Sequence, residues 1–142
     1  MELQTTVEIQ AKPAEVWRVM ADVERWHEWT PSIDSIQLLN GPEIAPGVRA
    51  KIKQPKLPTV VWTVDTVEPN HSFTWTNSNL GTKNVGIHTV EPSPTGGSRV
   101  TLTVHQSGFF FMFMPWIRGM TLRYMEMEAN GLRKYSEAKV LV

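Results

Sequence analysis

The side chain best suited to chemistry in this sequence is a single histidine, His88. Gly86, His88 and Val90 are two residues apart, so on a β-strand their side chains lie on the same face. Val90 should face the core, so His88 should face it too. An imidazole in an apolar cavity can act as a general acid or base near neutral pH, or orient a ligand carbonyl. The competing interpretation is a core histidine satisfied by one hydrogen bond.

Two tryptophans and two amide side chains could complete a binding site around this histidine. Trp62 and Trp75 lie on neighbouring predicted strands, and alternation turns both inward, where they could form an aromatic wall or simply pack the core. Asn77 continues the face of Trp75 toward the sheet end, and Gln54 follows Ile52 on its face. Either amide could contact a ligand at the cavity mouth, although Asn77 could equally begin a turn.

A tyrosine and a glutamate near the end of the chain are spaced for one face of a helix. Tyr124 and Glu128 are four residues apart. If that face bordered the cavity, they could form an acid/base pair, with Thr121 adding a hydroxyl. The pattern instead favours the solvent edge of an amphipathic helix for this pair.

The uncharged run Phe109–Ile117 is rich in phenylalanine and methionine. It is too short to cross a bilayer. We favour a loop and first helical turn that close the cavity mouth, with a dimer interface as the second interpretation. A third is an exposed apolar patch that touches a membrane or a protein partner, for which Arg118 and Arg123 would suit anionic lipid head groups.

Composition excludes several classes of function. The 142 residues include 14 basic and 14 acidic side chains, so the basic excess typical of nucleic-acid binders is missing. The absence of cysteine rules out disulfides and argues against structural zinc. The histidines fall on different predicted elements, and there is neither a phosphate-binding glycine loop nor a nucleophile-elbow serine. We expect no metal site and no cofactor.

The chain reads as one domain, residues 1–142, large enough to bury a core. Met1–Gln10 lacks the apolar centre of a signal peptide, and no apolar run reaches the about 18 residues that a membrane span needs. We therefore expect a cytoplasmic protein without stable membrane insertion.

The elements that must position these side chains follow a simple order. Thr6–Gln10 alternates as a strand, and Pro13 suits the first turn of a helix. A second short helix is predicted within Asp22–Pro31, with Asp22 as its N-cap and with Trp26 and Trp29, three residues apart, on its inner side. Strands joined by short turns follow, which implies an antiparallel meander. Thr121–Lys139 is the predicted helix long enough to cover the apolar face of that sheet.

Several segments in this order match a known family. They are Ala11–Trp17, Asp22–Trp29, Val64–Pro69 leading into Phe73–Trp75, His88–Pro92, Gly97–Thr101 and Glu128–Leu132. The chain thereby resembles the START-like, helix-grip superfamily (SRPBCC), specifically the polyketide cyclase/dehydrase-type lipid-binding proteins with the Bet v 1-like fold. The resemblance implies an α+β fold, with a curved antiparallel sheet of about seven strands wrapped around a long C-terminal helix. It also implies two short helices after the first strand and an apolar cavity, but no reaction.

Three functions follow from these expectations. The first is binding of an apolar small molecule, of the lipid, polyketide, quinone or isoprenoid class. The second is a cyclase, aromatase or dehydratase that uses His88 as acid/base. The third is protein interaction through Phe109–Ile117, and a homodimer stays open. We expect the cavity to be lined by Trp29, Ile52, Trp62, Phe73, Trp75, Asn77, Gly86, His88, Leu102, Thr121, Tyr124 and Met125.

Overall fold

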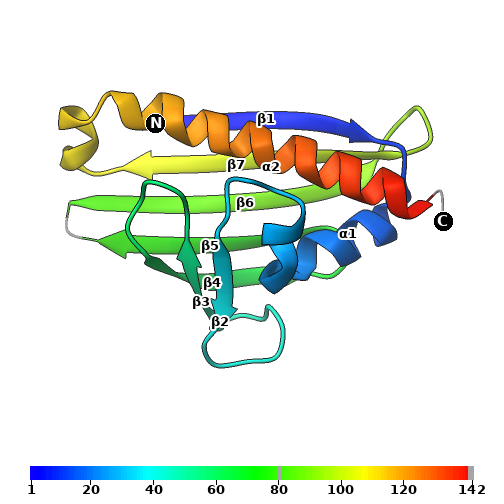
Figure 1. The fold of residues 1–142 in the computed structure, drawn as a ribbon, viewed down its shortest axis with the longest axis horizontal. Coiled ribbons are helices and arrows are strands. Elements are labelled where there is room, and N and C mark those ends of the chain that lie inside the picture. The colour runs from blue at the N-terminus through cyan, green and yellow to red at the C-terminus, as the bar shows by residue number, and fades with distance from the viewer. Residues whose placement is uncertain (80, 141–142) are drawn as a thin grey trace.

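The computed structural model describes residues 1–79 and 81–140, which form an α+β fold (Figure 1). In chain order the elements are β1 (Glu2–Ile9), α1 (Pro13–Ala21), the 3₁₀ helix η1 (Val23–Glu28), β2 (Ser35–Leu38), β3 (Arg49–Lys53), β4 (Val60–Glu68), β5 (Ser72–Asn79), β6 (Thr82–Pro92), β7 (Ser98–Ser107), the 3₁₀ helix η2 (Phe109–Phe113) and α2 (Trp116–Val140). The predicted fold class is confirmed, including the two short helices after the first strand. The long helix begins directly after Pro115, earlier than the predicted start at Thr121.

All neighbouring strands pair antiparallel in a seven-stranded sheet of order β1-β7-β6-β5-β4-β3-β2. Hairpins connect β2 to β7 as a meander, and β1 closes the order by pairing with β7. The β4–β5 register shifts between Val64 and Thr66, an irregularity of the kind that bends a strand and increases its twist. Figure 1 shows α2 running along one face of the sheet near β1 and β7, with α1 near its C-terminal end.

The two short helices after β1 are tied together by a buried tryptophan. The indole N–H of Trp26 donates to the Met20 carbonyl over 2.9 Å, which fixes η1 against the end of α1. Trp26 and Trp29 share the inner side of η1, as predicted, with ring centroids 5.4 Å apart. Asp22 is the N-cap residue of η1, as predicted, but its side chain makes no cap hydrogen bond, and its own carbonyl accepts from the Arg25 amide.

A glycine sets how closely α2 approaches η1. A Cβ placed on Gly131 would lie well under 3.0 Å from the Trp29 carbonyl oxygen, closer than real Cβ contacts come. Gly131 therefore lets the helix backbone touch the end of η1. Met125, Ala129 and Leu132 form the buried stripe of α2 that faces the core. The close contact fixes which turns of α2 lie over the sheet.

Candidate functional site

A cavity of about 300 Å³ lies between the sheet and α2. Its walls come from β3 to β7, the β3–β4 loop, η2 and the N-terminal half of α2, with Trp26 and Ile33 at its inner side. Apolar side chains dominate the lining, and a few amide, hydroxyl and ionisable groups interrupt it. This size and composition are those of a site for a small organic ligand.

The structure brings ten of the twelve predicted cavity residues around this space. They are Ile52, Trp62, Trp75, Asn77, Gly86, His88, Leu102, Thr121, Tyr124 and Met125, and Gln54 joins them. The other two lie elsewhere. Phe73 is fully buried, with its ring near those of Trp17 and Trp26, because the short helices fill the space in front of it. Trp29 packs under α2 and lines a separate groove.

His88 is buried and paired with a carboxylate from the long helix. Its Nε2 lies 3.2 Å from Oε1 of Glu128, and their side chains are 7% and 16% exposed. Its other ring nitrogen, Nδ1, is buried and has no hydrogen-bond partner among the described residues. An imidazole beside a carboxylate in a cavity wall is a pair that can exchange a proton.

Aromatic rings hold the imidazole in place. Phe73 stacks on it, with ring centroids 4.2 Å apart and planes 5° from parallel. Trp75 meets it edge-on at 5.4 Å, and Trp26 lies tilted at the same distance. Packing on these sides fixes the χ angles of His88, so its nitrogens point in defined directions.

The helical pattern favoured the solvent edge for Tyr124 and Glu128, although the expected cavity lining included Tyr124. Both line the cavity instead of the solvent edge. They do not act as a pair either: Glu128 reaches His88, whereas the Tyr124 hydroxyl donates to the Pro55 carbonyl in the β3–β4 loop. The spacing of these residues shows that they share a face of the helix. Which part of the sheet that face meets depends on how α2 crosses the sheet, and the spacing does not give this.

Amide side chains form a polar end of the cavity. The Asn84 side chain donates to Asn77 Oδ1 over 3.1 Å, and Gln106 Nε2 donates to Thr121 Oγ1 over 3.0 Å. The Oε1 atom of Gln106 is buried and has no partner among the described residues. Sequence reasoning missed Asn84 and Gln106, although period-two alternation places them on the faces of His88 and Leu102.

Residues 109–117, which we call the lid, form one end of the cavity. Phe111, Met114 and Ile117 line it, while η2 projects from the end of the molecule away from the C-terminus (Figure 1). The Phe110 amide donates to the Gly81 carbonyl over 3.3 Å, which ties the lid to the β5–β6 turn. The lid interpretation of this run fits these contacts.

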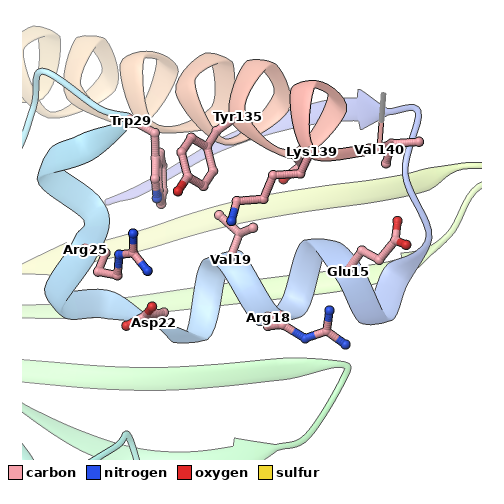
Figure 2. A pocket seen from close by; sticks show the side chains of 10 residues that line it. Glu15, Arg18, Val19, Asp22, Arg25, Trp29, Tyr135, Lys139 and Val140 are labelled. Carbon is pink, nitrogen blue, oxygen red and sulfur yellow. The ribbon is translucent and has the colours of Figure 1, made fainter. Parts of the chain in front are cut away.

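A second hollow of about 270 Å³ lies between α1, η1 and the C-terminal end of α2 (Figure 2). Figure 2 shows acidic and basic side chains around it, with the aromatic rings of Trp29 and Tyr135 at one end. Arg25 is engaged by Glu28: the side-chain hydrogen bonds between them raise the pKa of Arg25 and lower the pKa of Glu28. Mixed charge in an open groove selects no ligand class, so we place the candidate site in the first cavity.

Within residues 1–79 and 81–140, no group of three or more His, Asp or Glu side chains could hold a metal ion. Over the same residues, no helix is both long and apolar enough to cross a membrane.

Comparison with protein families decides the affiliation of the chain. Residues 1–137 match the family described as polyketide cyclase/dehydrase and lipid transport. The chain belongs to this family. Family members with this fold suit a ligand-binding role, in agreement with the cavity between sheet and helix. No curated protein sequence matches the chain.

Solved structures show the same fold at low sequence identity. The Zhui aromatase/cyclase from Streptomyces sp. R1128 matches with a TM-score of 0.79 and 15% identity, over 99% of this chain and 95% of that one. A hypothetical protein from Helicobacter pylori gives 0.80 and 15%, over 95% and 86%. The protein Ara h 8.0201 gives 0.70 and 14%, over 97% and 98%. These similarities establish the Bet v 1-like fold of this family member.

Proposed function

We propose that this protein binds an apolar small molecule, of the lipid, polyketide, quinone or isoprenoid class, in the cavity between the sheet and α2. The observation that carries the proposal is the cavity itself, whose walls are largely aromatic and aliphatic. Trp62 and Trp75 stand at its side with ring centroids 5.7 Å apart, a surface for a flat or extended apolar ligand. The amide end supplies hydrogen bonds to one polar group of the ligand.

Mass spectrometry of the protein from its native host, before and after organic extraction, tests this proposal. We expect a stoichiometric apolar compound that extraction removes. Displacement of an apolar fluorophore, followed with compounds of the four classes, then ranks the ligands. A protein that carries no compound, and takes up neither the fluorophore nor any of the four classes, contradicts the proposal.

The His88–Glu128 pair favours a second candidate, an acid/base enzyme of the cyclase, aromatase or dehydratase type. In such chemistry the His88–Glu128 pair would take a proton from the carbon beside a ligand ketone and hold it between Nε2 of the imidazole and the carboxylate. The same proton would return to a departing hydroxyl group, which leaves as water. The pairing distance of 3.2 Å and the burial of both side chains support these roles.

Hydrogen exchange tests this candidate without knowledge of the substrate. The protein in D₂O should speed deuterium uptake at the α-carbon of an apolar aryl ketone, followed by NMR. His88→Gln should reduce this rate by about 100-fold or more, while fluorophore binding persists. A rate that is unchanged in His88→Gln removes the histidine from the mechanism.

A further inference from the structure

The lid has two apolar faces, and one of them is not covered by the described chain. Its inner face lines the cavity through Phe111, Met114 and Ile117. Its outer face points away from the cavity and is largely exposed: Phe109 59%, Met112 78%, Phe113 69% and Trp116 60%. A cluster of exposed aromatic and methionine side chains of this size is unusual on a protein surface and indicates a contact partner.

The lid is held in this orientation by backbone contacts. Phe110 donates to Gly81, and a Cβ on Gly108 would collide with the Gly81 backbone. Gly108 has a φ of 114°, which other residues rarely adopt. The turn at Gly108 therefore holds the lid so that its outer face points away from the sheet.

Basic side chains lie on segments that adjoin the lid, and these segments contain no acid. Lys56 lies in the β3–β4 loop, Lys83 follows the β5–β6 turn, and Arg118 and Arg123 follow the lid on α2. Residues 54–59, 81–83 and 105–125 contain no Asp or Glu. No ion pair with another described residue engages any of these four cations. All four are exposed.

Acidic side chains near this end do not cancel the excess. Asp34 is paired with Lys53 at 3.8 Å, and Glu2 lies on β1 opposite His105. The first acid of α2 is Glu126, about 15 Å along the helix from Trp116. Arg123 follows Trp116 by about two helical turns and shares its face, and Glu126 lies a further turn along the helix, so Arg123 is the nearer of the two to the lid.

We propose that the outer lid face docks onto the surface of a bilayer that contains anionic lipids. Aromatic side chains enter the head-group boundary of such a surface, and flanking cations contact its phosphates. A second copy of the chain would bring two basic rims together, which Coulomb repulsion opposes. Because the opposite face of the lid lines the cavity, docking turns the cavity mouth toward the bilayer, and this last consequence rests on the proposed function.

Co-sedimentation with vesicles tests the docking. The protein should sediment with vesicles that contain phosphatidylglycerol, less with pure phosphatidylcholine, and less again at higher ionic strength. Arg118→Glu combined with Arg123→Glu should weaken association by about tenfold or more. The triple variant Met112→Ser, Phe113→Ser and Trp116→Ser should abolish association with the vesicles, because these side chains supply the apolar contact.

Matched controls exclude general effects. Lys12→Glu with Lys134→Glu reverses two exposed cations away from the lid, and Leu39→Ser with Val61→Ser removes two exposed apolar side chains elsewhere. Both control proteins should sediment like the unmodified protein. All variants should keep fluorophore binding in solution, so loss of docking and loss of the ligand site are separate results.

Two outcomes overturn the inference. One is that the protein sediments with neither type of vesicle, or equally well when the lid is substituted. The other is a dimer in analytical ultracentrifugation that the triple serine substitution converts to monomer, since a second copy would then cover the lid.

Discussion

At the scale of single residues, His88 is defined by its neighbours rather than by its own type. Phe73 stacks on one face of the ring, Trp75 meets it edge-on, and the Glu128 carboxylate lies 3.2 Å from Nε2. Removal of the imidazole would leave a void among large rings and the Glu128 carboxylate without its partner. Stability and chemistry at this position are therefore coupled.

His88→Ala should lower the free energy of unfolding by about 2–3 kcal/mol, because it opens a cavity and leaves Glu128 unpaired in a mostly buried position. Urea denaturation measures the change. His105→Ala is the matched control, since His105 is exposed on β7, and should change stability by about 0.5 kcal/mol or less. Equal effects of the two substitutions would contradict the packing described for His88.

The Glu28 carboxylate should titrate below its ordinary pKa of 4.5, because side-chain hydrogen bonds from Arg25 favour the charged form. Its contribution to stability is thus present above the pKa of the unfolded chain and is lost as pH falls through the lower folded pKa. NMR titration of the side-chain carboxyl measures this midpoint. Arg25→Gln should move the midpoint back up toward 4.5, and a midpoint that stays put would show that the hydrogen bonds are not its cause.

At the scale of elements, the site depends on how α2 crosses the sheet. Its position is set where the helix backbone touches the end of η1, at Gly131 and Trp29. The same helix carries Thr121, Tyr124, Met125 and Glu128 into the cavity. A small shift at the contact would therefore move every helical side chain of the site.

Gly131→Ala and Gly119→Ala should act in opposite directions, although both replace glycine within α2. Alanine is the better helix former by about 1 kcal/mol, so Gly119→Ala should stabilise, because nothing lies near its added methyl group. Gly131→Ala should destabilise by about 1–3 kcal/mol, because its methyl group meets the Trp29 carbonyl. Thermal unfolding of both variants decides the matter, and a stabilised Gly131→Ala would refute the close contact.

At the scale of the whole molecule, the sheet and α2 enclose a space that a ligand can fill. A ligand at about hundredfold its Kd should add about 2.7 kcal/mol of stability and raise Tm by roughly 5–12 °C. Val104→Trp is the test variant, since Val104 lines the cavity and a larger side chain there takes up space that the ligand would occupy. In this variant the ligand should no longer raise Tm. A Tm increase as large as in the unmodified protein would place the ligand elsewhere.

Much of the fold follows from patterns within short segments. Alternation in residues 100–104 and helical spacing in residues 122–132 report which side chains of each element face inward. Tryptophan-rich residues 22–31 likewise predicted one inner side for Trp26 and Trp29, which the structure confirms. The seven predicted cavity residues on strands were accessible to this reasoning because each lies on the inward face of its own strand.

The sequence by itself determined the order of the elements and the inward face of most of them, because those properties arise from contacts along one segment. Only the tertiary structure decided that Glu128 meets His88, that Phe73 lies behind the cavity and that the lid has an exposed outer face. These facts depend on the position of α2 over the sheet and on the turn at Gly108. Contacts between residues far apart in the chain set both, and no local period records them.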